Sequence, residues 1–533
     1  MEKSVTKALL MTALITNSLV VGAVTVFAEE SLTEYTLDTM VVTATRTEKR
    51  DVDVPASTEI ITYEDIVDSG SVNAMEAVSK MLGVDYNTYL PGGSAQTSMT
   101  NEINVRGFSY GTLILVNGNP INLNNTYVID AIPAEAIERI EVVKGGGSVL
   151  YGSEAQSGVI NIITKKKISN KVRAGFGNYK QQQYNVAVGD DKLKINYDLK
   201  KWGYVKEARY TAANTYTNLK ESSNENIGIG YNFNDQLSFE YNHLDTEVSY
   251  ESLKKGRLNS FTDSSNKQDL IQLNYNGNKT KSHAWFNKTK LDYAGSNARN
   301  LFENESFGAD LQQNIELNDK SLLTVGGVYK REVYNSKLKR GKPGIGKKAR
   351  NQMGLFAQLD YKFNDKDNVI IGGRGTWTSS ESNGQSYDNF STSAQYIHKF
   401  NQDKSFYISV AESFVMPSFK QMFPSSWVET KPNPDLKPQE GINYEMGYKE
   451  ISGNHAWKVA LFHMDVKDNI SATLNKDDTY EYNNQDFKNT GFEASLRVDA
   501  SEKFDYDLGL LVHNPKYKWD TDIRNGWHNK FGK

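Results

Sequence analysis

The most regular feature of the sequence is an alternation of apolar and polar residues that starts near residue 170 and continues to about residue 513. Clear examples are the segments 193–199, 227–233, 237–241, 355–363 and 442–448. A period of two indicates a strand with one apolar and one polar face, because successive side chains of a strand point to opposite sides. The alternation predicts about seventeen strands, the first near Lys171 and the last near His513.

The connections between these strands fall into two classes. Short turns rich in Asn, Asp, Gly and Lys occur at 189–191, 234–235, 318–320, 364–367, 401–404, 452–454 and 501–503. The connections between those turns are longer and vary in length. Short turns on one edge and long loops on the other are the layout of a transmembrane barrel, and a soluble sandwich or propeller has no reason to segregate them. We therefore expect an all-β, antiparallel transmembrane barrel.

Composition narrows the classes further. The chain has 533 residues, a formal charge of −4, no cysteine, and 30 Tyr, 22 Phe and 7 Trp. The missing cysteines exclude disulfides and thiolate metal sites, and the near-neutral charge argues against a nucleic-acid partner. After the first 28 residues no apolar stretch is long enough for a spanning helix. A polar, aromatic-rich chain fits a barrel with a polar lumen and aromatic girdles.

The N-terminus predicts export. Lys3 and Lys7 precede an apolar run from residue 8 to 26, which ends at Ala28 before Glu29. A basic start, an apolar middle and a small residue before an acidic one describe a signal peptide over residues 1–28.

A second globular segment, residues 51–165, precedes the barrel, which we assign to 166–533. It mixes predicted helices after Thr62, within 72–82 and from Pro133 through Ile137 with predicted strands at 113–116, 140–143 and 159–164. The glycine-rich stretch 145–158 lacks the Lys-Ser/Thr ending of a phosphate-binding loop. We expect a small α+β domain.

An odd number of antiparallel strands cannot close a barrel, and open edges are not tolerated in lipid. We therefore expect the barrel of this sequence to be incomplete at its C-terminal end.

An ordered set of short motifs resembles TonB-dependent outer-membrane receptors. The motifs are the box at 38–46 (DTMVVTATR), then VRGF at 105–108, LVNG at 115–118, IERIEVVKG at 137–145, SVLYGS at 148–153 and GVINIITK at 158–165. In the barrel, FVMP at 414–417 with NPDLKP at 433–438, and NTGFE at 489–493, resemble family loop patterns. The resemblance implies an N-terminal plug inside the lumen of a barrel of about 22 strands.

The resemblance also implies partners and roles. The segment 29–50 would be a periplasmic extension whose box binds the TonB complex of the inner membrane, through Asp38, Thr39, Met40, Val41, Val42, Thr43 and Ala44. Its β-branched residues suit addition to a partner's sheet edge, and an ordinary plug strand is the alternative. Arg106, Gly107, Tyr151 and Gly152 would shape plug turns, with Arg139 and Glu141 at the contact between plug and barrel. The remaining expectations are a monomer in the outer membrane of a Gram-negative-type bacterium, touching lipid and lipopolysaccharide.

The expected cargo is a scarce metal chelate. Seven Lys and Arg residues lie in the outer loop 337–350, which carries no acid of its own, so an anionic ferric siderophore of the catecholate type is favoured. Candidate ligand contacts are Tyr86, Tyr89, Tyr127, Lys339, Arg340, Lys347 and Lys348. Cobalamin and haem stay open, although haem is less favoured because no histidine lies in the plug or between residues 414 and 438.

Three other classes of protein fit the sequence less well than a receptor: a porin, an adhesin and an enzyme. A passive porin shares the barrel but needs neither box nor plug, and a surface adhesin would use the long loops without transport. An enzyme is not expected, because no nucleophile–base pair or metal cluster has sensible spacing. No bound cofactor or resident metal is expected.

Overall fold

The computed structural model describes residues 41–42, 46–87, 102–124, 127–212, 214–296, 299–338, 346–381, 385–423, 430–475, 480–501, 504–521 and 524–529. The chain divides into two units, residues 1–35 and 36–533, and every described residue belongs to the second.

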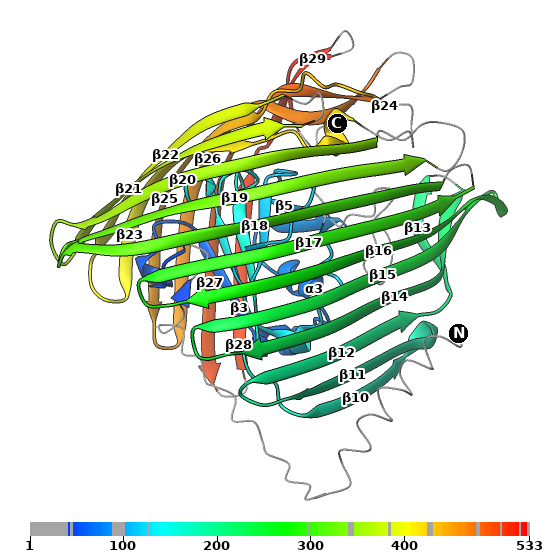
Figure 1. The fold of residues 1–533 in the computed structure, drawn as a ribbon, viewed down its shortest axis with the longest axis horizontal. Helices are drawn as coiled ribbons and strands as arrows, with labels where there is room; N and C mark the ends of the chain where they lie inside the picture. The colour runs from blue at the N-terminus through cyan, green and yellow to red at the C-terminus, as the bar shows by residue number, and fades with distance from the viewer. Residues whose placement is uncertain are drawn as a thin grey trace, which may run out of the picture. The chain divides into compact units, whose positions relative to one another are not determined.

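One sheet of 21 strands dominates this unit, and its strands follow one another in sequence order (Figure 1). They are β10 (Lys171–Gly177), β11 (Gln181–Gly189), β12 (Leu193–Trp202), β13 (Val205–Ala212), β14 (Thr215–Asn232), β15 (Leu237–Lys254), β16 (Arg257–Asn276), β17 (Thr280–Gly295), β18 (Arg299–Asn318), β19 (Ser321–Leu338), β20 (Gly346–Lys362), β21 (Asp367–Ser380), β22 (Tyr387–Lys399), β23 (Lys404–Val415), β24 (Thr430–Lys431), β25 (Gln439–Ser452), β26 (His455–Leu474), β27 (Tyr480–Ser501), β28 (Phe504–His513), β29 (Lys516–Thr521) and β30 (Arg524–Asn529).

Three of these strands, β24, β29 and β30, have only two or six residues, and the remaining eighteen lie close to the number of about seventeen expected from the alternation. Long-strand neighbours pair antiparallel, as Phe239 with Tyr231 and with Leu273. Among the described residues no pairing joins β10 to β28 or β30, so β10 is an edge strand. The expected shortage of strands stays a prediction.

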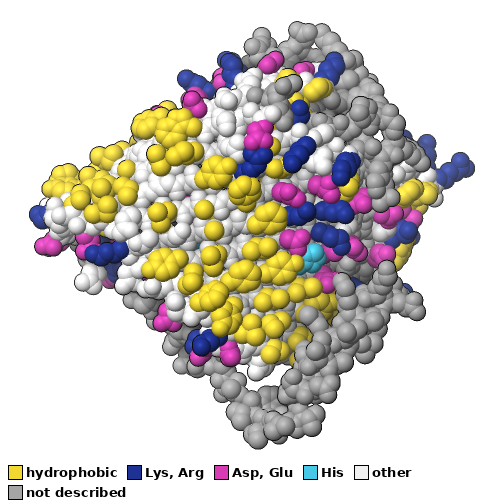
Figure 2. Space-filling view, in the orientation of Figure 1, with side chains coloured by type: hydrophobic (Ala, Val, Ile, Leu, Met, Phe, Trp, Pro, Cys, Tyr) yellow, Lys and Arg dark blue, Asp and Glu magenta, His cyan; other side chains and the backbone are white. Residues whose placement is uncertain are grey.

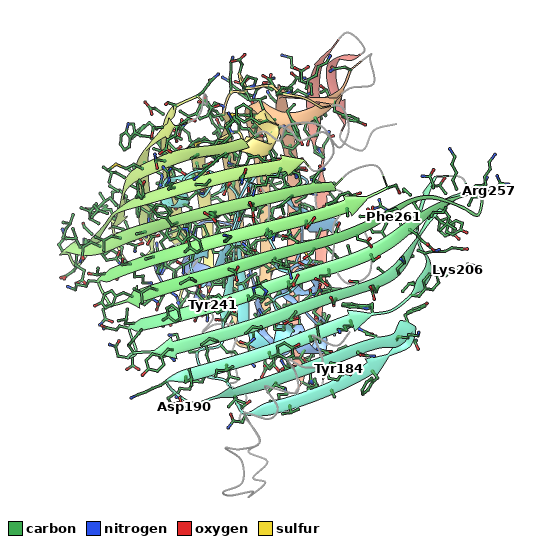
Figure 3. All side chains as sticks on the ribbon, turned by 45° about the vertical axis from the view of Figure 1, so that its right-hand side comes forward. Tyr184, Asp190, Lys206, Tyr241, Arg257 and Phe261 are labelled. Carbon is green, nitrogen blue, oxygen red and sulfur yellow. The ribbon has the colours of Figure 1, made fainter. Side chains whose placement is uncertain are left out.

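The two ends of the sheet differ less in connection length than predicted, because strands extend into most of the expected long loops: residues 255–256 alone separate β15 from β16, whereas residues 416–429 separate β23 from β24. Figure 3 shows Asp190, in a short turn, at one end and Lys206, Arg257 and Phe261 at the other, which we call the turn end and the loop end. The face seen in Figure 2 carries a broad band of hydrophobic side chains, bordered toward the loop end by charged ones. Leu273, Phe307 and Leu355 are among the exposed hydrophobic side chains of the sheet. The opposite face is lined by buried polar residues.

The segment before the barrel folds as an α+β domain, the plug, inside the curve of the large sheet (Figure 1). Its five-stranded sheet has the order β3 (Thr58–Thr62), β8 (Ile137–Lys144), β9 (Gly158–Thr164), β6 (Thr112–Val116) and β7 (Asn119–Pro120). A hairpin of β4 (Val84–Asn87) and β5 (Glu102–Val105) lies beside it. The helices are α2 (Tyr63–Asp68), α3 (Ala74–Val78) and α4 (Ser148–Tyr151), with 3₁₀ turns η2 (Asp51–Asp53) and η3 (Ala134–Ala136).

Local sequence explains most of these elements. Thr62 caps α2, because its hydroxyl accepts from the Asp65 amide while the Asp65 carboxylate accepts from the Thr62 amide. The expected helix from Pro133 through Ile137 is wrong: only a single 3₁₀ turn follows Pro133, because Ile137 already begins β8, which pairs with β3 and β9. No helix among the described residues is long and apolar enough to cross a membrane.

The plug has an apolar core, which also takes in Leu244 and Leu270 of the wall, and it meets the wall through many polar side chains and a second apolar contact of Phe108 with Phe487. Ile66, Val78, Ile114 and Ile160 are among the core residues with no exposed surface. At the wall, amides bind amides or backbone: Asn119 donates to Asn274 (2.7 Å), Asn124 to Asn304 (3.1 Å), and both Gln268 (3.1 Å) and Asn287 (2.9 Å) to the Ile121 carbonyl. The plug is therefore held in the lumen by hydrogen bonds and ion pairs together with shared apolar clusters.

Candidate functional site

The box region begins with a very short hairpin. Val41–Val42 (β1) pairs antiparallel with Lys49–Arg50 (β2), joining residue 41 to 50 and residue 42 to 49. The other box residues, Asp38, Thr39, Met40, Thr43 and Ala44, lie outside the described residues. Two backbone pairings form a weak ladder, so this strand could separate from β2 and pair with another edge.

Arg46, the last residue of the motif 38–46, lies within this hairpin and is fixed to both plug and wall. Its Nη1 lies 3.2 Å from the Asp310 carboxylate in β18, and its guanidinium lies 4.6 Å from the Tyr151 ring centroid in the plug. Gln312 Nε2 also donates to the Arg46 carbonyl at 3.2 Å. Arg46 has φ +63°, a left-handed conformation that a non-glycine residue keeps only when its contacts hold it. A displacement of the box would therefore first disturb the contacts of Arg46 with Asp310, Tyr151 and Gln312.

The following residues place this region at the turn end. Lys49 Nζ lies 2.7 Å from Asp360, and Arg50 donates to the carbonyl of Gln402 in a short turn at 2.9 Å. Asp360 lies two residues before the end of β20, beside another short turn.

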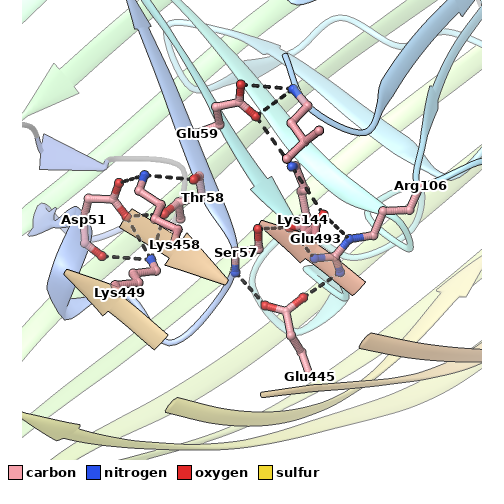
Figure 4. A network of polar contacts seen from close by, with 11 residues as sticks. Asp51, Ser57, Thr58, Glu59, Arg106, Lys144, Glu445, Lys449, Lys458 and Glu493 are labelled. Atoms are coloured by element: carbon pink, nitrogen blue, oxygen red, sulfur yellow. Dashed lines mark hydrogen bonds and ion pairs between the residues drawn. The ribbon is translucent and has the colours of Figure 1, made fainter. Parts of the chain in front are cut away.

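A buried charge cluster joins the plug to strands β25 and β27 (Figure 4). Arg106 of the VRGF motif lies 2.6 Å from Glu445 and 2.9 Å from Glu493, with only 3% of its side chain exposed. Its partners are held in turn, since the Ser57 amide donates to Glu445 at 2.6 Å and the Ser57 hydroxyl to Glu493. Burial opposes the charge of Arg106, but the two carboxylates outweigh it and raise its pKa above the usual range. We call these residues the Arg106 cluster.

A second buried cluster lies beside it and is centred on Asp51 of η2. Lys449 Nζ lies 2.8 Å from the Asp51 carboxylate, Lys458 binds the other oxygen, and the Thr58 hydroxyl donates to the first. Burial alone would raise the pKa of Asp51, but the two lysines hold it well below its usual range. Two lysines on neighbouring wall strands thus form ion pairs with one plug carboxylate.

The two clusters show what the sequence interpretation missed. Arg106 and Gly107 adopt φ +51° and +70°, so they do form a tight turn, and Gly152 follows α4 at φ +81°. The role of Arg106 is nevertheless larger than a turn, because its carboxylate partners come from the barrel. Glu493 belongs to the NTGFE motif, which lies inside strand β27 and not in a loop.

Arg139 and Glu141 pair with each other and not with barrel carboxylates. Arg139 Nε lies 2.9 Å from Glu141 and its Nη1 lies 2.7 Å from Glu138, all on β8. This ion pair lies within the plug, and Glu138 and Arg139 also border a cavity shared with barrel residues such as Asn232, so their expected place at the contact between plug and barrel stays a prediction. Tyr151 of the plug, in contrast, makes a cation–π contact with Arg46. Burial raises the pKa of its hydroxyl.

The expected ligand contacts divide into three groups. Tyr127 is buried in the plug core and its hydroxyl accepts from the Ile103 amide at 2.7 Å, so its assignment to an open ligand surface is wrong. Tyr86 is half-buried against the same core, Lys347 is exposed, and the Lys348 ammonium lies 4.6 Å from the Phe423 ring centroid. Tyr89, Lys339 and Arg340 lie outside the described residues.

The loop 337–350 is less basic in space than in sequence. Lys337 lies 2.9 Å from Glu303, and Arg350 lies 2.6 Å from Glu332 and donates to the Pro417 carbonyl at 2.7 Å. Neighbouring strands thus supply the acids that the loop lacks. Beside Arg350, the aromatic rings of Tyr334 and Phe419 stack with centroids 6.2 Å apart, which gives the loop end an aromatic and cationic lining.

A sheet with an apolar outer band, a polar inner face and a plug tied to that face by charge clusters defines a plugged β-barrel of the outer membrane. Family comparison agrees: residues 50–159 match the TonB-dependent receptor plug domain, and residues 165–532 match the β-barrel of TonB-dependent receptors. The chain belongs to the TonB-dependent receptor family, whose members are receptors and transporters, and it is an outer-membrane protein of the Gram-negative type.

Individual relatives are more distant. A vitamin B12 transporter of Vibrio vulnificus is 26% identical over 472 residues, which cover 81% of this chain and 69% of that protein. The ferripyoverdine receptor of Pseudomonas aeruginosa shares the fold with a TM-score of 0.63 and 15% identity, covering 91% of this chain and 77% of its own. The ferric enterobactin receptor of the same organism shares the fold with a TM-score of 0.65 and 16% identity, and the match covers 91% of this chain and 86% of that receptor.

Proposed function

We propose that this protein imports a scarce metal chelate across the outer membrane, with energy supplied by the TonB complex through the box at residues 38–44. The observation that carries the proposal is the position of Arg46. It lies two residues after Ala44, binds the wall through Asp310, and contacts the plug through Tyr151. A pull on the box would therefore be transmitted to the plug through one buried side chain.

For the cargo we propose an anionic ferric siderophore of the catecholate type. The supporting feature is the loop end, where Lys347 is exposed and the Lys348 ammonium lies over the aromatic ring of Phe423. Aromatic, negatively charged chelates suit such a lining, since cations attract the charge and rings pack on rings. Siderophore receptors share this fold, although their low identity says nothing of cargo.

Cobalamin is the second candidate. It is favoured by the sequence relative named as a vitamin B12 transporter, which matches most of this chain. The two cargoes differ in charge, so we expect capture of the anionic chelate to depend more strongly on the basic residues of the loop 337–350.

The energised step is tested by Val41→Pro in cells that depend on this protein for uptake. Proline removes a backbone N–H and resists strand pairing, so uptake should fall to the level seen when the proton-motive force is collapsed. Binding of labelled chelate to intact cells should be unchanged. Val41→Ile, which keeps the β-branched side chain, is the matched control and should transport normally. Normal uptake by a correctly inserted Val41→Pro protein would refute the assignment of the box.

The cargo is tested by growth on a ferric catecholate as the sole iron source, and separately on limiting cobalamin, in cells that lack other receptors for each. Replacing four basic loop residues by Gln should weaken catecholate capture several-fold at low salt and less at high salt, because salt screens exposed charges beyond about 8 Å. The four residues are Lys339, Arg340, Lys347 and Lys348. Lys337→Gln is the control, because Glu303 already pairs with that charge. Growth on cobalamin alone would replace the first candidate by the second.

A further inference from the structure

A small cavity lies between the plug and the wall strands β17 to β21. Its volume is about 40 Å³, and its lining includes Arg46, Glu154, Trp285, Lys330, Gln352 and Arg374. A single water needs about 10–15 Å³ measured in this way, so the cavity holds about three water-sized particles. It is too small for a chelate, and it belongs to neither the box hairpin nor the two charge clusters.

Arg374 is the unusual member of this lining. Its side chain is 1% exposed, and two of its nitrogens have acceptors: Nε donates to the Thr376 hydroxyl at 3.0 Å and Nη1 to the Leu150 carbonyl at 3.3 Å. Its Nη2 is buried and has no acceptor among the described residues. The guanidinium fits between two glycines, since a Cβ on Gly152 would lie 3.0 Å from Nη2 and one on Gly354 would overlap it. The free N–H groups are therefore held in a fixed position.

Two further donors on the same lining also lack acceptors among the described residues. They are the Trp285 indole Nε1 and the Arg46 Nε, both buried. Glu154 has a buried carboxylate oxygen for which no donor lies among the described residues. Three unmet donors against one unmet acceptor call for an occupant that mainly accepts hydrogen bonds.

The charges around the cavity also favour an occupant that accepts hydrogen bonds and carries negative charge. Arg46 is balanced by Asp310, and the pair Lys330 and Arg350 is balanced by Glu332, which contacts both at 2.6 Å, together with Glu154. Arg374 remains as one positive charge without a counter-charge in contact among the described residues. An arginine does not lose its proton in proteins, and an uncompensated buried charge is strongly unfavourable.

We propose that this cavity binds one monovalent anion, chloride in the cell, with Arg374 Nη2 as its principal donor. Trp285 and Arg46 supply further N–H groups on the same lining. The Glu154 carboxylate on that lining repels a second negative charge, which excludes phosphate and other polyanions. The anion would stabilise the plugged state by balancing Arg374 where it holds the Leu150 carbonyl of α4.

The test uses the full chain in detergent micelles, with sodium gluconate replaced by sodium chloride or bromide at constant ionic strength. Halide should raise the Tm by about 2 °C at a hundredfold excess over its Kd. Arg374→Met, which removes the charge but keeps much of the volume, should abolish the halide effect. Arg497→Met should keep it, because that arginine is paired with Asp65 and lies outside the lining of this cavity.

Crystals grown with bromide give a second measurement that needs no variant. An anomalous peak within hydrogen-bond distance of Arg374 Nη2 is expected. A cavity that holds only water in those crystals would overturn the proposal, and so would a Tm that halide leaves unchanged or an equal halide effect in Arg374→Met.

Discussion

Removing Arg106 should loosen the plug without unfolding the barrel. Arg106→Met leaves Glu445 and Glu493 buried and facing each other without their shared cation. Breaking a buried ion pair by deleting one partner costs about 3–5 kcal/mol. Both carboxylates keep other donors, since Ser57 binds both and Tyr407 donates to Glu445 at 2.8 Å. We therefore expect the lower value, about 3 kcal/mol, in the free energy of plug unfolding.

The absence of cysteine makes the measurement direct. A single cysteine at Asp68, an exposed position at the end of α2, carries an environment-sensitive fluorophore that reports the plug alone. Urea is titrated in micelles while the far-UV signal of the barrel persists. With a slope of about 1–3 kcal/mol per molar urea, a loss of about 3 kcal/mol lowers the plug midpoint by roughly 1–3 M.

Two variants decide whether the reasoning holds. Arg139→Met is the matched control, because that arginine pairs only with carboxylates of its own strand and should shift the midpoint much less. The triple variant Arg106→Met, Glu445→Gln, Glu493→Gln should recover more than half of the loss, since no charge is then left unpaired. A free energy of plug unfolding for Arg106→Met within about 0.5 kcal/mol of wild type, or equal midpoint shifts for both arginines, would refute the ion-pair argument.

Three shorter predictions follow from other contacts. Asp310→Asn should release Arg46 and shift a spin label in β1 toward its mobile state by about tenfold, read by electron paramagnetic resonance, whereas an unchanged spectrum would remove Arg46 as the anchor. Asp51 has a pKa below that of its unfolded state, near 3.9, so its contribution to plug stability is complete above about pH 5 and lost as the pH falls through the folded pKa. Asp51→Asn should flatten that acid limb in urea titrations, and an unaltered limb would contradict the assignment. Gly107→Ala should lower plug stability by about 1–2 kcal/mol more than Gly70→Ala, because both have positive φ but only the former meets a side chain, at 3.0 Å.

Much of the fold could be predicted because strands and caps are local features. The alternation around Tyr444 and Met446 identified a strand, and it also placed Glu445 and Lys449 on the polar face. The Thr62 cap needed only residues three positions apart. Period and turn chemistry carry such information within a few residues.

The site was harder because its pairs are distant in sequence. Arg106 and Glu493 are 387 residues apart, and a period of two says which face a residue occupies but not what lies across the lumen. Tyr127 was assigned to a ligand surface because its loop was expected to face outward, yet packing against Ile103 buries it. A buried acid within a barrel motif, Glu493, was the available signal for a plug partner.

The amide-lined contact between plug and wall has a thermodynamic consequence. Pairs such as Asn119 with Asn274 and Asn124 with Asn304 can exchange each other for water with little net change in hydrogen bonding. Separation of these surfaces exposes polar area, whereas unfolding of the core around Ile114 exposes apolar area. The two have heat-capacity changes of opposite sign. A plug that slides along the wall intact should therefore show only a small heat-capacity change, because the apolar contact of Phe108 with Phe487 offsets the polar ones, and one that unravels should show a large positive change.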